Sequence, residues 1–388
     1  MHEAPTLSTA GVTLLETARR FRREQVAPHA GRWERERSVP RETLRAAARL
    51  GLTGIEVPPE LGGQGAGFLA KTRIAEEISR SCMAFAFSLI NTQNAAARIA
   101  RHGSKAQIER YLAPLIAGER IGCTALTEPQ AGSDFPAIAT TAQRAAGGWI
   151  INGEKAWLTN AAIADVITLY AKTDVAAAGA GIAAFLVDTS TPGVERVGPY
   201  AMIGGHAIGA GGVKLSDVRV GDDALFYPPG EAFKRALDGI NGARTYVAAM
   251  CCGMVAESLG IALDYAQRRH TFGKRLLEHQ GLRWSLVEIA TDLEAARRLT
   301  YRAAELIEHG EDAVLAAAMA KKFAVRMAQQ RLGDCMQAMG AEGLRENHPI
   351  GRHIACARIA GYVDGSSEMM NERIGALLER AYLGADAP

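Results

Sequence analysis

The stretch WIINGEKAWLTN, residues 149–160, decides the fold predicted for this chain of 388 residues. Trp149, Ile150 and Ile151 form an apolar run, Asn152-Gly153 follows, and a second β-favouring run, KAWLT, comes next. Asn-Gly between two such runs is a strong hairpin signal, so the sequence predicts a strand, a turn and a second strand. We therefore expect a β domain in the middle of the chain.

Further β segments follow this stretch at short intervals. VITLYA (166–171), IAAFLV (182–187) and VKLSDVRV (213–220) predict strands, separated by turns that contain Gly and Asp and not by long helices. Such a series favours a compact antiparallel β domain, a small barrel or a sandwich, over residues 122–229.

On both sides of this domain, apolar residues recur every three or four positions, as in amphipathic helices. Residues 14–26, 41–50 and 70–90 show this spacing, and they predict an α-helical domain over residues 1–121. Residues 244–265, 285–309 and 313–339 show it again, with Gly340 and Gly343 as stops. Long helices of this kind predict a four-helix bundle over residues 230–388. The fold class is therefore α+β, in the order α, β, α.

The composition bounds the class of protein. Hydrophobic residues make up 48%, charged residues 22%, and a formal net charge of +2 favours neither nucleic acid nor an anionic membrane as partner. None of the six cysteines forms a C-x-x-C pair, which argues against a disulfide framework or a metal site and favours a reducing cytoplasm. The N-terminus shows no export signal, and we find no apolar run long enough to span a bilayer.

Two segments of the β domain carry candidate ligand-binding residues. ALTEPQAGSD (125–134) ends in a Gly-Ser-Asp turn, whose N–H groups and hydroxyl suit an anionic or carbonyl ligand. Trp157 and Thr159 stand two residues apart, so on a strand they point to the same side and suit a flat heteroaromatic ring. Taken singly, Trp157 is more typical of a core residue and Thr159 of an ordinary strand residue.

A third segment, YVDGSSEMM (362–370), places Asp364 between an apolar pair and Gly-Ser-Ser. Asp-Gly usually marks a turn, so the plainer interpretation is a solvated loop acid. The alternative is a catalytic carboxylate held in a pocket.

Together these segments resemble the acyl-CoA dehydrogenase family of flavoproteins across essentially the whole chain. The resemblance rests on ALTEPQAGSD, NGEKAWLTN, YAQRRHTFGK (265–274) with Gln280, QAMGAEG (337–343) and YVDGSSEMM, in the family's order and spacing. It implies the family's three-domain fold, with FAD bound between the β domain and the C-terminal bundle.

The resemblance also implies roles for single residues. Positions that contact FAD are matched by Leu126, Thr127, Ser133, Trp157, Thr159, Ser366 and Glu368, and positions that reach FAD from a neighbouring subunit by Arg269, Phe272, Gln280, Gln337 and Ala341. Positions that contact substrate are matched by Ser133, Asn241, Arg244, Val363 and Gly365. An arginine on a pyrophosphate is physically reasonable, because its fork of donors suits paired phosphate oxygens.

In the family a glutamate usually removes the α-proton of the acyl thioester while the β-hydrogen leaves as hydride to flavin N5. Its counterpart here is Asp364, whose side chain reaches roughly 1.5 Å less far. Some members carry the base at the position of Ala243, so Asp364 is the candidate that remains. Val363 and the small residues Ala360 and Gly361 favour a short, branched or alicyclic acyl group, although tight helix packing explains small residues equally well.

The first hypothesis is therefore FAD-dependent α,β-dehydrogenation of an acyl-CoA, with an electron-transfer flavoprotein as electron acceptor. The resemblance implies a homo-oligomer, usually a homotetramer built as a dimer of dimers. An aspartate base leaves two alternative substrates: a nitroalkane, as in nitroalkane oxidase, and an acyl group on a carrier protein. A nucleic-acid-binding flavoprotein is disfavoured by the near-neutral charge.

Overall fold

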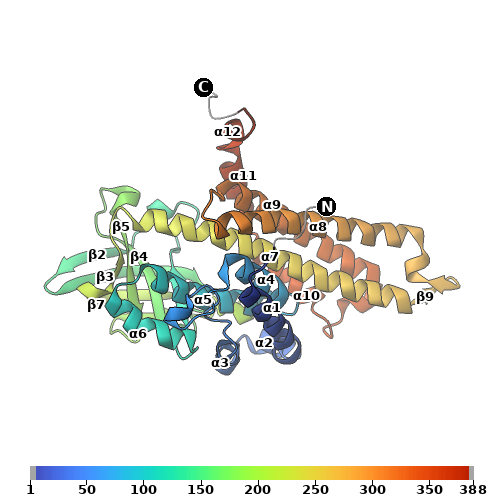
Figure 1. The fold of residues 1–388 in the computed structure, drawn as a ribbon, viewed down its shortest axis with the longest axis horizontal. Coiled ribbons are helices and arrows are strands. Elements are labelled where there is room, and N and C mark those ends of the chain that lie inside the picture. The colour runs from blue at the N-terminus through green and yellow to red at the C-terminus, as the bar shows by residue number, and fades with distance from the viewer. Residues whose placement is uncertain (1–5, 384–388) are drawn as a thin grey trace.

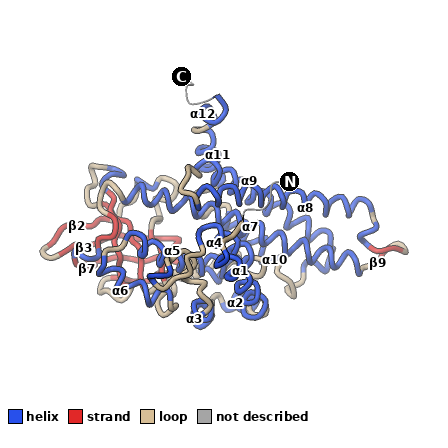
Figure 2. The backbone as a smooth tube through the Cα atoms, viewed as in Figure 1, coloured by secondary structure: helices blue, strands red, loops and turns tan. Residues whose placement is uncertain are grey.

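The fold separates strands from long helices along the longest axis of the molecule (Figure 1). The computed structural model describes residues 6–383, so residues 1–5, part of the segment judged for an export signal, lie outside the described residues. The elements follow the predicted order of N-terminal helices, middle sheet and C-terminal helices, which confirms the predicted fold class. Figure 2 shows the strands gathered at one end and a short hairpin at the other.

The N-terminal helices are α1 (Thr9–Phe21), continued by a π-helical turn (Arg22–Val26), α2 (Ala30–Glu36), α3 (Arg41–Arg49), α4 (Gly67–Ser79), α5 (Met83–His102) and α6 (Lys105–Ile116). α1 begins after Ser8, whose hydroxyl accepts a hydrogen bond from the Gly11 N–H that the first turn leaves unpaired. The stretch predicted as helical over residues 70–90 belongs to two helices. The chain turns between them, and Cys82 caps α5 by accepting the Phe85 N–H.

The middle of the chain forms one eight-stranded sheet in the order β6-β7-β3-β2-β4-β5-β8, with β1 beside β4. The strands are β1 (Gly122–Ala125), β2 (Thr141–Ala145), β3 (Gly148–Leu158), β4 (Val166–Lys172), β5 (Ile182–Asp188), β6 (Val194–Val197), β7 (Gly211–Gly221) and β8 (Leu225–Tyr227). The predicted strands over 166–171, 182–187 and 213–220 are confirmed as β4, β5 and β7. Most neighbours are antiparallel, as predicted, but β1 runs parallel to β4, and β2 meets β4 in parallel at one residue pair.

The turn predicted at Asn152-Gly153 is wrong, because β3 continues through both residues. The hairpin turn lies earlier, between β2 and β3, where Ala145 pairs with Gly148. Gly153 has a φ of +147°, and the register of β3 against β7 shifts just before it, as at a β-bulge. A Cβ on Gly153 would lie 2.7 Å from the Cα of Thr140, so the glycine permits a close approach of two backbones and does not mark a turn.

The C-terminal part consists of α7 (Ala232–Arg268), the hairpin β9 (His270–Thr271) and β10 (Lys274–Arg275), α8 (Gln280–Glu308), α9 (Val314–Met339), α10 (Ile350–Ala360), α11 (Ser367–Gly375) and α12 (Leu378–Leu383). α7, α8 and α9 pack against one another, and α10 packs on α7 and α9, which gives the predicted bundle. α9 ends at the predicted stop Gly340, which adopts a φ of +58°. α7 runs from the sheet to the β9–β10 hairpin (Figure 1).

α7 also corrects an expectation about apolar runs. By length and composition it could cross a membrane, although no such run was expected from the sequence. In the structure, 72% of its most apolar window is buried, which is typical of a helix at the centre of a protein core.

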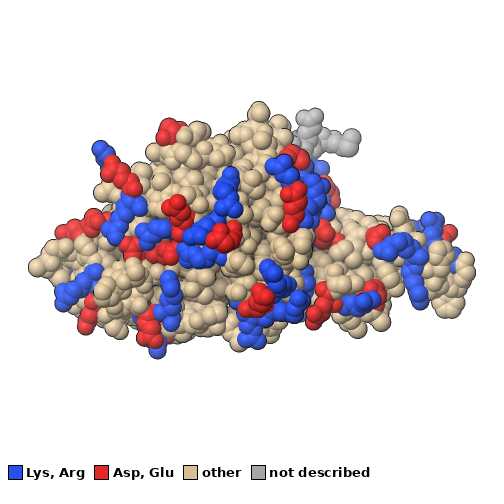
Figure 3. Space-filling view, turned by 90° about the horizontal axis from the view of Figure 1, so that it is seen from below, with Lys and Arg blue, Asp and Glu red and all other residues tan. Residues whose placement is uncertain are grey.

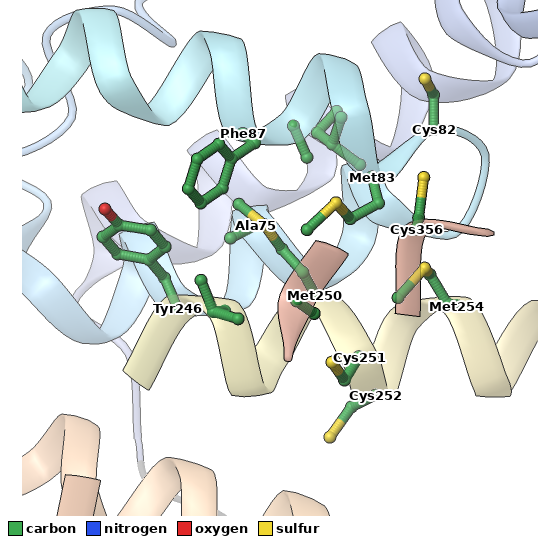
Figure 4. Packing of buried hydrophobic residues seen from close by; sticks show 14 of the residues in the cluster. Ala75, Cys82, Met83, Phe87, Tyr246, Met250, Cys251, Cys252, Met254 and Cys356 are labelled. Carbon is green, nitrogen blue, oxygen red and sulfur yellow. The ribbon is translucent and has the colours of Figure 1, made fainter. Parts of the chain in front are cut away.

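Three large clusters of buried apolar residues join these parts. The first links the N-terminal helices to α7–α10, the second links α5, α6 and the start of α7 to the sheet, and the third lies within the sheet. Figure 4 shows part of the first cluster, with Met83 of α5, Met250 of α7 and Cys356 of α10 among its side chains. α5, and α7 of the bundle itself, therefore contribute side chains both to the cluster against the sheet and to the cluster within the bundle.

Candidate active site

The loop between α10 and α11 presents Asp364 on a backbone that few residue types adopt easily. Asp364 has a φ of +54° and Gly365 a φ of +98°, so both lie in the left-handed region. Glycine adopts this region freely, and aspartate is several-fold enriched there among other residues. The Asp-Gly pair thus forms a turn between two helices, which ends where Ser366 caps α11 by accepting the Met369 N–H.

Two buried cations hold the backbone of this loop. Lys321 of α9 donates hydrogen bonds from Nζ to the carbonyls of Val363 and Gly365. Arg244 of α7 donates from Nε to the carbonyl of Asp364 over 3.2 Å. Lys321 is 1% exposed and Arg244 6% exposed, so neither charge is solvated freely. Three consecutive carbonyls of the loop are therefore fixed by positive side chains from two helices of the bundle.

The Asp364 carboxyl is largely removed from water. The residue as a whole is partly exposed, but its Oδ2 is buried and has no hydrogen-bond partner among the described residues. Burial raises the pKa of Asp364, while the positive charges of Lys321, Arg244 and Arg98 offset part of that rise. A buried, unpartnered carboxyl with a raised pKa is typical of a functional site. A solvated loop acid, the plainer interpretation of the sequence, does not fit these observations.

Lys321 was missed in the sequence, although a signal for it exists. Ala317, Ala324 and Ala328 form a buried stripe along α9, and Lys321 stands on that stripe at helical spacing. A lysine within an otherwise apolar face requires a specific partner. Burial lowers the pKa of Lys321 to about 8, even though the charge of Asp364 acts in the opposite direction.

A buried ion pair joins the two motifs of the β domain. Glu128 of ALTEPQAGSD and Lys155 of NGEKAWLTN lie 2.8 Å apart, with side chains 2% and 0% exposed. Lys155 also donates to the carbonyl of Leu126, and the N–H of residue 156 donates to the carbonyl of Thr127. These contacts bring the predicted cofactor residues Leu126 and Thr127 beside Trp157. Neither Glu128 nor Lys155 was singled out from the sequence.

The prediction that Trp157 and Thr159 point to the same side of one strand is wrong. β3 ends at Leu158, so Thr159 lies in the following turn, and Trp157 has a φ of +60° next to a second shift of register. Trp157 is no core residue either, because it is 63% exposed and its ring packs edge to face on Tyr200, with 4.9 Å between centroids. An exposed indole held from one side leaves a face for a flat ligand.

Around Asp364 the structure gathers four of the five predicted substrate residues, namely Asn241, Arg244, Val363 and Gly365, whereas Ser133 lies in the β domain. Asn241 accepts a hydrogen bond from Nη1 of Arg244 over 2.9 Å, which orients the guanidinium that holds the loop. Val363 and Gly365 flank Asp364 in that loop. The predicted cofactor residue Glu368 is exposed in the first turn of α11, and Ser133 is exposed in the Gly-Ser-Asp turn of the β domain.

The residues predicted to act from a neighbouring subunit lie elsewhere. Arg269, Phe272 and Gln280 are exposed around the β9–β10 hairpin, and Gln337 and Ala341 are exposed near the end of α9. The hairpin is separated from the sheet by the 37 residues of α7, a length of about 55 Å at 1.5 Å per residue. One chain therefore does not bring the hairpin residues and Trp157 to a single cofactor.

A cavity of about 420 Å³ lies between α4, α5 and α7. Its lining carries both signs of charge, with Arg98, Arg101 and Arg235 beside Glu56, Asp238 and Glu308, and Tyr246 lines it as well. Tyr246 is buried, packs edge to face on Phe87 and accepts a hydrogen bond from the side chain of residue 94. Burial, and next the charge of Asp364, raise the pKa of Tyr246. Tyr246 thus lies close to both the cavity and the carboxylate.

The described residues fit a flavin cofactor. The exposed ring of Trp157 lies beside the backbone of Leu126 and Thr127, and the turn that follows them is open, since a Cβ on Gly132 would have no neighbour within 4 Å. Exposed Arg269, at the far end of α7 from the sheet, could offer its guanidinium only to the phosphate oxygens of a cofactor held by a second copy of the chain. An aromatic face, backbone groups and an arginine are the groups that bind a ring system and a pyrophosphate.

Comparison with known proteins identifies the family in all three parts of the chain. Residues 11–119 match the N-terminal domain, residues 123–218 the middle domain and residues 230–378 the C-terminal domain of acyl-CoA dehydrogenase. The human mitochondrial short-chain specific acyl-CoA dehydrogenase is 35% identical over 370 residues, which cover 95% of this chain and 90% of that protein.

Solved structures agree with this match. Butyryl-CoA dehydrogenase from Megasphaera elsdenii is 29% identical with a TM-score of 0.93, over 97% of this chain and 100% of that chain. A structure of PigA with FAD and proline is 28% identical with a TM-score of 0.90, over 96% of this chain and 98% of that chain. The chain therefore belongs to the acyl-CoA dehydrogenase family, and it is an oxidoreductase whose cofactor is FAD.

Proposed function

We propose that this enzyme oxidises a short-chain acyl-CoA thioester between its α and β carbons, with Asp364 as the base. The observation that carries the proposal is the Asp364 carboxyl, whose buried Oδ2 has no partner among the described residues. A carboxylate can remove a proton next to a carbonyl when it is ionised and shielded from water. The Asp364 carboxyl is shielded from water, and the cations around it favour its ionised form.

The chemistry divides between cofactor and chain. FAD, when bound, supplies the two-electron oxidant that accepts the β-hydrogen with its electron pair. Asp364 accepts the α-proton, and a carbon–carbon double bond forms between the two positions. The Asp364 N–H donates to no group among the described residues, so it is available to the thioester carbonyl, where negative charge develops as the proton leaves. Arg244 and Lys321 hold the carbonyls of this loop and so fix that N–H.

The packing around the loop supports a short acyl group more than a widened site. Gly361 is small because a Cβ there would lie 2.9 Å from Nε2 of Gln329 on α9, and Ala360 is buried in the core. Their size thus favours the packing explanation. Tyr246, on which the charge of Asp364 acts, packs on Phe87 in the interior. The name of the human relative, a short-chain specific enzyme, points to the same substrate class.

The partners follow from the same proposal. We propose a homo-oligomer, a dimer of dimers, because Phe272 at the β9–β10 hairpin is 95% exposed and Trp284 at the start of α8 is 59% exposed. Electron-transfer flavoprotein is the proposed electron acceptor, and the cytoplasm the proposed location. Figure 3 shows Lys and Arg interspersed with Asp and Glu over one face, which does not favour nucleic-acid binding by that face.

Anaerobic bleaching of the flavin tests the proposal. The purified holoenzyme is mixed with butyryl-CoA, isobutyryl-CoA, cyclohexanecarbonyl-CoA, octanoyl-CoA, butyryl-pantetheine and nitroethane. Butyryl-CoA is expected to reduce the flavin fastest, and Asp364→Asn to slow that reduction by a factor on the order of 10²–10⁴. Glu372→Gln, an exposed acid on α11, serves as the control and keeps the wild-type rate.

Two results would contradict the proposal. If Asp364→Asn bleaches the flavin at the wild-type rate, Asp364 is not the base. Faster reduction by nitroethane than by any thioester would replace the substrate class by a nitroalkane, and reduction by butyryl-pantetheine as fast as by butyryl-CoA would favour a carrier-bound substrate.

A further inference from the structure

Lys321 places a positive charge inside the C-terminal bundle, next to the proposed base. Its side chain is 1% exposed, on a stripe of α9 that is otherwise lined by alanine. Among the described residues it meets no carboxylate at salt-bridge distance, and its Nζ donates instead to the carbonyls of Val363 and Gly365. A buried ammonium is costly unless it is hydrogen-bonded, so these two carbonyls are what keep Lys321 in place.

The contacts connect Lys321 to Asp364 in two ways. The carbonyls that it holds belong to the residues on either side of Asp364, so it fixes the backbone at both ends of the base. Its charge also lowers the pKa of Asp364 more than the charge of Arg244 or of Arg98 does. Arg244 is connected to Asp364 in the same two ways, but it holds one carbonyl of the loop where Lys321 holds two.

We infer that Lys321 is a positioning residue for the dehydrogenation: it holds the loop so that Asp364 faces the α-hydrogen. The inference rests on the proposed function, because it requires Asp364 to be the base. Lys321 acts through the loop and takes no proton from the substrate.

The charged and titratable groups around this pair set the expected pH dependence. Asp364 faces Lys321 from α9, Arg244 from α7 and Arg98 from α5. Lys321 faces Asp364, Arg244 and also Cys251 of α7, whose thiol stays protonated because burial raises its pKa to about 12. Arg373 of α11 acts on this group through Arg244. Among these described groups, Lys321 is therefore the cation that titrates near neutral pH, with a pKa of about 8.

Two pH effects follow from the signs of these interactions. The charge of Lys321 lowers the pKa of Asp364, so without it the carboxylate would take up a proton at a higher pH. The acid side of the rate profile then moves to higher pH. Because burial lowers the pKa of Lys321 to about 8, the wild-type enzyme loses the cation, and with it activity, as the pH rises through about 8. An arginine at this position stays charged there.

The test measures the rate of anaerobic flavin reduction by butyryl-CoA from pH 5 to 9 in four holoenzymes: wild type, Lys321→Met, Lys321→Arg and Lys322→Met. Lys322 is the adjacent residue of α9 and is exposed, so it controls for loss of one lysine. We expect Lys321→Met to reduce flavin about ten- to a hundredfold more slowly, as for a misplaced catalytic group, with its acid limb at higher pH. Lys322→Met is expected to match the wild type.

Each outcome decides the inference. A folded, FAD-loaded Lys321→Met whose pH profile superimposes on the wild type overturns it. If Lys321→Met does not fold or bind FAD, Lys321→Arg decides the question. The inference is supported if the rate of flavin reduction by Lys321→Arg no longer falls near pH 8, and it is overturned if the rate still falls there. Asp364→Asn in the same assay separates the two proposals. Unchanged reduction in Asp364→Asn defeats the proposed function, whereas an inactive Asp364→Asn with an unchanged Lys321→Met defeats the Lys321 inference alone.

Discussion

Replacing Lys155 by methionine would show how strongly the two motifs of the β domain are held by their buried ion pair. Burial by itself raises the pKa of Glu128, but the charge of Lys155 and hydrogen bonds from residues 139 and 140 lower it from 4.5 to about 2. Glu128 is therefore ionised at neutral pH. Methionine keeps most of the volume of Lys155 but leaves Glu128 as an unpaired buried charge, which costs about 3–5 kcal/mol of the free energy of unfolding.

The pH dependence gives an independent measure of the same interaction. The fall of the Glu128 pKa from 4.5 to about 2 corresponds to about 3 kcal/mol, at 1.36 kcal/mol per unit. In the wild type this contribution is fully present above pH 4.5 and is lost as the pH falls toward 2. In Lys155→Met, burial without a cation raises the pKa of Glu128, so acid protonates it and relieves the unpaired charge. The stability difference between the two proteins should therefore narrow from pH 7 to pH 4.

Urea unfolding followed by circular dichroism measures both quantities. Lys214→Met, an exposed lysine on β7, is the matched control and is expected within about 0.5 kcal/mol of the wild type. The double variant Lys155→Met/Glu128→Gln should recover part of the loss, because no charge remains buried. The reasoning is refuted if Lys155→Met lies within about 1 kcal/mol of the wild type at pH 7, or if its deficit is the same at pH 4.

Three further predictions concern a glycine, the exposed hairpin and the acyl site. Gly63→Ala should unfold at a much lower temperature, since its Cβ would lie 2.1 Å from the carbonyl oxygen of Val57. Gly62 has a φ of +87°, and a Cβ there would have no neighbour within 4 Å, so Gly62→Ala should lose only about 1 kcal/mol of the free energy of unfolding in the same thermal scan. Phe272→Ala should leave the unfolding free energy within about 0.5 kcal/mol but reduce the oligomeric mass and the bound FAD in sedimentation velocity at 450 nm, and an unchanged oligomer would exclude the hairpin from the interface. Tyr246→Ala should raise kcat/KM for hexanoyl-CoA relative to butyryl-CoA, whereas Tyr246→Phe should keep the wild-type ratio; equal ratios in all three proteins would place the acyl group elsewhere.

Much of the fold could be predicted because its signals are local. The strands at 166–171, 182–187 and 213–220 and the helical periodicity of α8 and α9 depend on nearby residues, and each was confirmed. The turn predicted at Asn152-Gly153 was wrong because the same residue types occur in hairpin turns and in β-bulges. What distinguishes the two is the backbone of Thr140, which lies just before β2 and leaves no trace in the sequence around Gly153.

Residues of the candidate site could be predicted from the sequence where they belong to a motif. Their contacts with residues far away in the chain could not, because those contacts depend on packing. Asp364 was found through its motif, but the cations that hold its loop come from α7 and α9, and Lys321 stands 43 positions earlier in the chain. Glu128 and Lys155 each look like a solvated charge in sequence, because only the fold places them 2.8 Å apart. Trp157 was predicted to bind a ligand from strand alternation, but its exposure comes from a positive φ, which strand alternation does not predict.

The left-handed backbone at position 364 limits how this enzyme can evolve or be engineered. A φ of +54° admits glycine, asparagine and aspartate with ease, and of these only aspartate carries a carboxyl. Mutants selected for a longer acidic side chain at this position would bear a conformational penalty in addition to any change in proton transfer. Adjusting the reach of the base is therefore easier from a distance, through substitutions on α7 and α9 that shift the whole loop, and libraries aimed at new substrates should sample those helices and leave position 364 fixed.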